Sequence, residues 1–376
     1  MLSLRLLVPA NIRHHSGGNA YNARLVQGLK ALGARVEVLA VEGSWPAASA
    51  KERRRLGSLL GAWETSAETT FGTVTLVDGL IALGAPDELE YAAAARRPAW
   101  VLLHMPSAGD PGSEARALCA AAGVISTSSS TAAAIRSLHG LPGSHIALPG
   151  TDPAPVAKGS DPPHIIAVAA LLPNKDQLLS VEALALIQDL DWTAAFVGSD
   201  ETDPEYAAQV RAAVTAHGLG DSVQLTGELR GEALDNAWDR ADLSLLVSRE
   251  EAFGMVVTES LARGVPVLVR EGTGAVEALT LASPRPTETD PGETDDTLPG
   301  AVVGLSDNPE PLAAVVRHWL EEPRLRLAWR EAAMSARVRL PGWDATARTV
   351  LEIMGGHGTG KPASGADTTA IAADGQ

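Results

Sequence analysis

The chain has 376 residues, a formal net charge of −16 and one cysteine, Cys119. An acidic balance with no stripe of Lys and Arg argues against binding to a nucleic-acid backbone. A lone cysteine excludes an intramolecular disulfide and a cysteine-based metal site, and we expect it to be a small buried residue. No stretch of about 18 apolar residues predicts a membrane span, and no signal peptide is predicted, so we expect a cytoplasmic location.

Short apolar runs alternate with amphipathic helical stretches along the chain, which is typical of parallel sheets covered by helices. In the first half, strands are predicted at Arg5–Val8, Arg35–Val41, Val74–Val77, Trp100–His104 and Gly123–Ser126. In the second half, they are predicted at His164–Ala169, Thr193–Val197, Ser222–Leu225, Leu243–Val247 and Val265–Val269. The predicted fold class is therefore α/β, with two doubly wound Rossmann-like domains that face a central cleft.

Changes in composition predict the domain boundaries. Residues 1–150 form the first predicted domain, the Pro-rich residues 151–163 a linker, and residues 164–342 the second domain. Residues 343–355 are predicted to be a final helix that returns toward the first domain, and residues 356–376 a disordered tail. The segment 283–298 is predicted to be a mobile surface loop. A ligand is expected between the domains, at the carboxyl ends of the strands.

The strongest local signal lies between Ser248 and Glu259. An apolar strand, a tight turn at Gly254 and a helix follow one another there, and the free N–H groups at the helix start suit a phosphate. Glu259 lies one to two turns into that helix, where a carboxylate could bind the paired hydroxyls of a ribose or hexose. On spacing alone, a solvent-exposed acidic helix is an equally good interpretation.

Seven residues separate Glu251 from Glu259, and this spacing, with Phe253-Gly254 and the following Ala262–Val267, resembles the donor-site signature of the family 4 retaining glycosyltransferases, which have the GT-B fold. The similarity extends to further short segments: Ser16–Asn19, Val101–His104, Pro149–Asp152 and Lys175. It implies transfer of a sugar from a nucleotide-diphosphate sugar to an unidentified acceptor, with retention, without metal and without a cofactor. It also implies that the second domain binds the donor nucleotide and the first the acceptor.

The resemblance also implies roles for individual residues of the second domain. Glu259 would bind the ribose hydroxyls of the nucleotide, and Glu251 would bind hydroxyls of the transferred sugar beside the bond that breaks. Lys175 would stabilise the diphosphate leaving group as a point charge. Backbone N–H groups would hold sugar and phosphate oxygens, and they belong to Phe253, Gly254 and Met255.

In the first domain the candidates are two glycines and a histidine. Gly17 and Gly18 lie in a predicted loop between a strand and a helix, where glycine permits positive φ and close approach to a ligand. The resemblance implies that this loop reaches the donor phosphates or the acceptor, although a plain tight turn is an equal alternative. His104 ends a strand, and the resemblance implies that it lies beside the reacting sugar. The alternative is a purely structural histidine that caps the strand. Asp78 also follows a strand and could contact the acceptor.

The sequence departs from the family pattern at two places. Ala169-Ala170 replaces the common Gly-Arg, so the usual phosphate-binding arginine is absent, and neither Arg249 nor Arg270 can be assigned in its place. Gly272–Glu277 replaces the pattern Gly-Gly-x-Pro-Glu. The alternatives are therefore a non-catalytic sugar-nucleotide-binding relative or a sugar-nucleotide 2-epimerase on the same fold.

Two further patterns favour ordinary interpretations. Asp189-Leu190-Asp191 resembles a metal motif only in its letters, so no metal site is predicted. The basic run Lys51–Arg55 is typical of a solvated helix face and allows at most peripheral contact with an anionic membrane.

Overall fold

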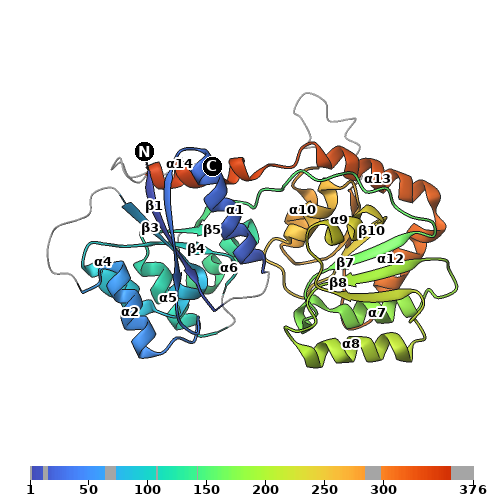
Figure 1. The fold of residues 1–376 in the computed structure, drawn as a ribbon, viewed down its shortest axis with the longest axis horizontal. Coiled ribbons are helices and arrows are strands. Elements are labelled where there is room, and N and C mark those ends of the chain that lie inside the picture. The colour runs from blue at the N-terminus through green and yellow to red at the C-terminus, as the bar shows by residue number, and fades with distance from the viewer. Residues whose placement is uncertain are drawn as a thin grey trace, which may run out of the picture.

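The computed structural model describes residues 2–11, 16–63, 73–106, 109–141, 143–283 and 298–356. Within these ranges the chain folds into two six-stranded parallel sheets, each covered by helices (Figure 1). The predicted α/β fold with two Rossmann-like units is confirmed. The predicted loop at 283–298 and the predicted tail at 356–376 lie almost entirely outside the described residues.

The first sheet has the strand order β2-β1-β3-β4-β5-β6. Its strands are β1 (Ser3–Pro9), β2 (Arg35–Val41), β3 (Thr73–Asp78), β4 (Trp100–Leu103), β5 (Gly123–Ser126) and β6 (His145–Ile146). The helices of this part are α1 (Gly17–Ala31), α2 (Ala50–Leu60), α3 (Gly79–Leu83), α4 (Pro86–Ala94), α5 (Pro111–Ala120) and α6 (Ser129–His139). The order reverses between β1 and β3, which is the kind of switch point at which doubly wound sheets bind ligands.

The second sheet has the order β12-β11-β10-β7-β8-β9 and reverses between β7 and β10. Its strands are β7 (His164–Val168), β8 (Thr193–Val197), β9 (Val223–Gly227), β10 (Leu243–Leu246), β11 (Val267–Arg270) and β12 (Gly300–Val303). Its helices are η1 (Pro173–Lys175), α7 (Gln177–Ala185), α8 (Pro204–Ala216), α9 (Glu232–Asp239), α10 (Met255–Ala262), α11 (Ala275–Thr280), α12 (Glu310–Glu321) and α13 (Pro323–Arg337). Renumbered from β7, this is the doubly wound order 3-2-1-4-5-6 of dinucleotide-binding folds.

The last helix, α14 (Trp343–Gly356), leaves the second sheet and packs on α1 beside the first (Figure 1). Ala347, Val350 and Met354 join the same buried cluster as Leu25 and Leu29 of α1. Residues 151–160 between the sheets contain neither helix nor strand. The chain therefore crosses between the two sheets twice, once before β7 and once before α14.

The structure differs from the sequence prediction in two strands and at the cysteine. The strands β6 and β12 were not predicted, because they have only two and four residues respectively and no long apolar run. Cys119 was predicted to be buried, but it is exposed on α5. Its neighbours Ala117 and Leu118 take the buried positions of that helix instead.

Candidate functional site

Lys175 and Glu251 meet at the switch point of the second sheet. Lys175 lies on the loop after β7 and Glu251 on the loop after β10, which are the two strands between which the order reverses. The Lys175 ammonium donates to Glu251 Oε2 at 2.7 Å, and the two side chains are 22% and 17% exposed. A charged donor and a charged acceptor thus stand together where a doubly wound sheet places its ligand.

The turn before α10 has the geometry that its sequence predicted. Gly254 has φ of +84°, and an added Cβ would lie 2.9 Å from Leu246 Cδ2, so glycine is required there. Phe253 is buried in the core beside α10, which anchors the turn. No side chain caps the N-terminus of α10 at Met255, so its first N–H groups are available to an acceptor.

Glu259 lies on α10 and is half-buried. Burial raises the pKa of its carboxyl above the usual range; Asp152 also raises it, while Arg263 and Arg24 oppose the rise. Among the described residues, no hydrogen bond or ion pair to this carboxylate is seen. Arg24 belongs to α1 and pairs with Asp152 at 2.6 Å, so Glu259 faces the boundary between the two halves of the molecule.

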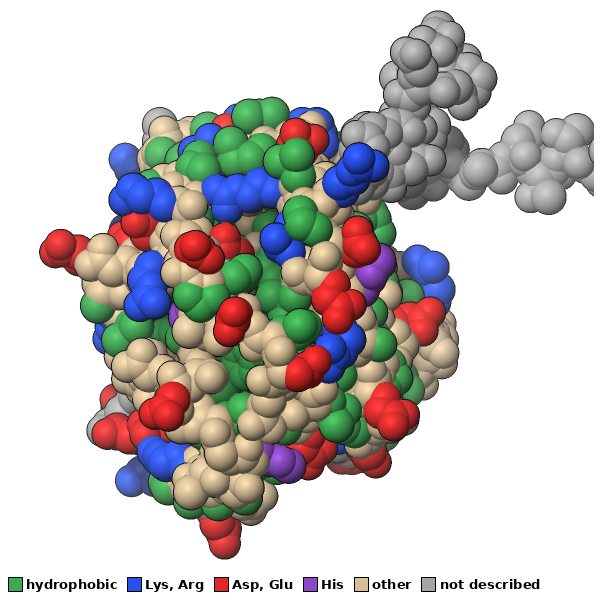
Figure 2. Space-filling view, turned by 90° about the vertical axis from the view of Figure 1, so that its right-hand side faces the viewer, with side chains coloured by type: hydrophobic (Ala, Val, Ile, Leu, Met, Phe, Trp, Pro, Cys, Tyr) green, Lys and Arg blue, Asp and Glu red, His purple; other side chains and the backbone are tan. Residues whose placement is uncertain are grey.

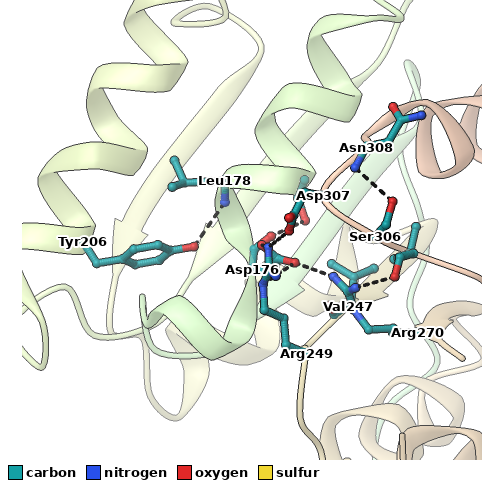
Figure 3. A network of polar contacts seen from close by, with 11 residues as sticks. Asp176, Leu178, Tyr206, Val247, Arg249, Arg270, Ser306, Asp307 and Asn308 are labelled. Atoms are coloured by element: carbon teal, nitrogen blue, oxygen red, sulfur yellow. Dashed lines mark hydrogen bonds and ion pairs between the residues drawn. The ribbon is translucent and has the colours of Figure 1, made fainter. Parts of the chain in front are cut away.

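The two arginines considered as replacements for the missing family arginine are both committed to Asp176 (Figure 3). Arg270 is buried, donates to the carbonyls of Val247 and Leu305 at 2.8 and 2.9 Å, and pairs with the Asp176 carboxylate. The Arg249 guanidinium lies 3.1 Å from Asp176. Arg270 is therefore a structural residue that ties the loop after β7 to the sheet, and Lys175 is the cation left beside Glu251.

His104 follows β4 and is held by two polar residues of the first half of the chain. Its Nε2 lies 3.2 Å from Asn22 Oδ1 and 3.4 Å from Asp78 Oδ2, and Asn22 Nδ2 donates to Asp78 Oδ2 at 2.7 Å. Burial by itself would raise the pKa of the Asp78 carboxyl, but hydrogen bonds from His104, Asn22 and the Leu80 N–H hold it below the usual range.

The prediction that Asp78 contacts the acceptor is wrong, because the side chain is buried. Only 3% of the residue is exposed, and its carboxylate also accepts from the backbone N–H of Leu80 as the N-cap of α3. The Asp78 carboxylate therefore contacts the His104 ring and caps the start of α3.

Gly17 and Gly18 were predicted to lie in a loop, and this prediction is wrong. They are the first residues of α1, because Ser16 caps the helix by accepting from the Asn19 N–H at 3.2 Å. Space is restricted at Gly18 but not at Gly17. An added Cβ at Gly18 would lie 3.1 Å from His104 Cδ2, and one at Gly17 would lie 3.6 Å from the Met255 methyl of α10.

Two contacts that the sequence did not predict join the two halves of the molecule. The backbone N–H of Ser129, at the start of α6, donates to Glu277 Oε2 at 2.9 Å, and Ser130 Oγ donates to the Ala252 carbonyl at 3.0 Å. Gly274 lets the loop after β11 pack on the loop that carries Glu251, since a Cβ there would meet the Ala252 carbonyl. Glu277 and Gly274 belong to the segment that replaces the family's Gly-Gly-x-Pro-Glu pattern.

Other classes of site receive no support from the described part of the chain. It contains no group of three His, Cys, Asp or Glu residues arranged to hold a metal ion, and Asp189 pairs with Arg317 at 2.6 Å. None of its helices has the length and apolarity needed to cross a membrane. On the face shown in Figure 2, Lys and Arg alternate with Asp and Glu and form no continuous basic surface.

Comparison with known families matches the part of the chain that holds Lys175, Glu251 and Glu259. Residues 151–336 match the family model described as glycosyl transferases group 1. This part of the chain is similar to that family, which supports the resemblance seen in the sequence.

Curated relatives align over parts of their length. A mannosylfructose-phosphate synthase of Agrobacterium fabrum is 29% identical over 121 residues, which are 31% of this chain and 27% of that protein. A D-inositol 3-phosphate glycosyltransferase of Streptosporangium roseum is 27% identical over 192 residues, which are 48% of this chain and 39% of that protein. This chain thus matches less than half the length of these relatives.

Solved structures match nearly the whole chain. A glycosyltransferase of Rickettsia africae has a TM-score of 0.72 at 17% identity and covers 96% of this chain and 99% of its own. Anabaena HepE, solved in complex with UDP and glucose, has a TM-score of 0.68 at 15% identity and covers 95% of this chain and all of its own. These similarities show that the whole chain has the GT-B fold.

Proposed function

We propose that this chain is a glycosyltransferase that moves a sugar from a nucleotide-diphosphate sugar to an acceptor, with retention of the anomeric configuration and without a metal ion. The ion pair between Lys175 and Glu251 carries the proposal. It lies at the switch point of a sheet within the part of the chain that is similar to the group 1 family, where charged groups can reach both the diphosphate and the sugar of one donor.

Each group of the site has a place in this proposal. Lys175 and the free N–H groups at the start of α10 bind the diphosphate, Glu251 binds the transferred sugar, and Glu259 binds the nucleotide ribose. When the bond between the sugar and the diphosphate breaks, its electron pair leaves with the diphosphate, and Lys175 balances the negative charge that grows there. The acceptor oxygen then bonds to the sugar and its proton passes to the departing diphosphate oxygen, with His104 beside the sugar.

The second candidate is a sugar-nucleotide-binding protein without transferase activity. Ala170 stands at the position of the family arginine, and both nearby arginines are engaged by Asp176. Lys175 is then the main charged ligand for the diphosphate. The two candidates differ in turnover and not in binding, so an activity measurement separates them.

The test begins with a thermal-shift screen of nucleotide sugars, because a bound donor raises the melting temperature. Transfer to candidate acceptors, and hydrolysis of the best donor, are then measured for the wild type, Glu251→Ala and Lys175→Ala. We expect each substitution to lower kcat about 10²- to 10³-fold, as for other groups that stabilise developing charge. Lys158→Ala is the matched control, since Lys158 pairs with Asp239 at the same distance of 2.7 Å but is far more exposed.

The outcomes are distinct. Lost turnover in both site variants with an active Lys158→Ala supports the proposal. A stabilising nucleotide sugar that the wild type neither transfers nor hydrolyses leaves the binding protein as the function. Turnover that epimerises the sugar, with no effect of Glu251→Ala, identifies the 2-epimerase.

A further inference from the structure

Asn22, Asp78 and His104 form a hydrogen-bonded group whose arrangement fixes where the histidine carries its proton. Asp78 accepts from the Leu80 N–H and from Asn22 Nδ2, so its carboxylate is ionised and acts only as an acceptor. Since the amide nitrogen of Asn22 points at Asp78, its oxygen is the atom 3.2 Å from His104 Nε2. Both neighbours of Nε2 are acceptors, and Nε2 must therefore carry the proton.

The rest of the ring is held by packing. Tyr21 meets the imidazole edge-on at 5.3 Å between ring centres, and the backbone of Gly18 closes over the Cδ2 edge. The His104 carbonyl accepts from Thr127 and Thr131, which fixes the backbone. Among the described residues nothing is bonded to Nδ1. A neutral imidazole with Nε2 protonated presents Nδ1 as an acceptor.

We propose that Asn22 and Asp78 are positioning residues for His104: together they hold the imidazole in the Nε2-protonated tautomer, so that Nδ1 accepts a hydrogen bond from a hydroxyl of the transferred sugar or of the acceptor. This inference rests on the proposed function for the identity of the substrate. The tautomer itself is a property of the protein and is measured without substrate.

The experiment uses the full chain labelled with ¹⁵N-histidine, with all variants measured at one fixed pH. His104→Gln assigns the signals of His104 among the nine histidines. We expect protonated Nε2 and unprotonated Nδ1 in the wild type. In Asp78→Asn the side-chain oxygen of the new asparagine can still accept from the Leu80 N–H at the start of α3. Its NH₂ group then faces His104 Nε2, so the proton of the imidazole should move to Nδ1. In Asn22→Ala the Nε2 proton should stay in place, because Asp78 still accepts from Nε2. The imidazole loses only its contact with Asn22 Oδ1.

Kinetics supply the second readout. Outer positioning partners typically contribute about 10- to 100-fold, and we expect kcat to fall by that factor in both variants. Affinity for a nucleoside diphosphate alone should not change, because Lys175 and Glu259 lie in the other half of the molecule. Glu114→Gln is the control: Glu114 pairs with buried His139 at 2.8 Å in the same domain, so it should alter the His139 signals and leave those of His104 and kcat unchanged.

Three results would overturn the inference: protonated Nδ1 in the wild type, an unchanged tautomer and kcat in Asp78→Asn, or loss of kcat that always accompanies equal loss of nucleoside-diphosphate affinity. If Asp78→Asn does not fold, Asn22→Ala decides, since full kcat in that variant contradicts a positioning role. If the wild type transfers no sugar, the proposed function fails while the tautomer measurement still decides how His104 is held.

Discussion

Lys175 and Glu251 form an ion pair at the switch point of the second sheet. A diphosphate that binds there competes with Glu251 for the ammonium group. The carboxylate should therefore weaken the binding of a nucleoside diphosphate while it assists the reaction of the intact donor. This opposition leads to a prediction that a simple binding role for Glu251 would not give.

We predict that Glu251→Gln binds a nucleoside diphosphate more tightly than the wild type, although it transfers sugar far more slowly. A half-buried ion pair contributes about 1 kcal/mol, so the gain should be roughly 3- to 10-fold. Titration calorimetry with the base chosen by the thermal-shift screen measures it. Asp239→Asn is the control, because it removes the partner of Lys158 away from the switch point. It should leave the affinity for the nucleoside diphosphate unchanged. Weaker binding by Glu251→Gln would show that Lys175 does not meet the diphosphate.

His164, at the start of β7, should make stability depend on pH. Burial lowers its pKa from 6.5 to about 4, and Arg240 adds to this effect. The folded chain therefore binds this proton more weakly than the unfolded chain, and the contribution of His164 is complete above pH 6.5 and is lost as the pH falls toward 4. Urea unfolding measures the free energy of unfolding at pH 7.5 and at pH 5. Its decrease between these two pH values should be smaller in His164→Gln than in the wild type by about 1–2 kcal/mol, after solvent screening. Exposed His217→Gln is the control and should keep the wild-type dependence.

Glu251 and Glu259 were predicted from the spacing of a motif, and Lys175 from a separate segment of the same family resemblance. Asn22 has no such spacing, since it lies 56 residues from Asp78 and 82 from His104. Only the sheet order brings the three together. The one local signal was a polar residue on the buried face of α1, next to Tyr21 and three residues before Leu25, and a buried polar group needs a partner.

At the scale of elements, the long apolar runs predicted all strands except β6 and β12. Strand β6 has only two residues, too few for any pattern, whereas β12 was missed although β4 and β10 have the same length of four residues. Strand β12 also depends on Gly300, whose φ of +134° brings it against the Val267 carbonyl. The N-terminal boundary of α1 was misplaced because the glycines were assigned to a loop, whereas the Ser16 cap starts the helix before them.

Helices α1 and α14 pack closely at Gly28. An added Cβ at Gly28 of α1 would lie 2.9 Å from Ala347 Cβ and 3.0 Å from the Trp343 carbonyl. Leucine favours a helix over glycine by up to about 1 kcal/mol, but overpacking costs about 1–3 kcal/mol. We therefore expect Gly28→Leu to lower the melting temperature. Ala23→Leu adds a side chain at an exposed position of the same helix and should have no such effect; an equal change in both would refute the close packing.

At the scale of the whole molecule, Glu277 joins the two halves through the start of α6. Removing one such hydrogen bond costs about 1 kcal/mol, so Glu277→Ala should raise the fraction of open molecules about fivefold. Small-angle scattering should detect a larger radius of gyration, and a saturating donor should reduce it again. Glu232→Ala removes an exposed carboxylate from α9 and should leave the scattering unchanged. An unaltered radius in Glu277→Ala would mean that the other contacts suffice to keep the halves together.

The return of α14 to the first sheet has a consequence for synthesis. About 200 residues separate the end of β6 from the start of α14, so the ribosome needs roughly 10–40 s to pass from one to the other. During that interval the first sheet can form and pack on Leu25 and Leu29 of α1, but their cluster still lacks Ala347, Val350 and Met354 of α14. A nascent chain therefore carries this cluster incomplete while the entire second domain is made. The N-terminal domain is thus the first to be translated and the last to be completed.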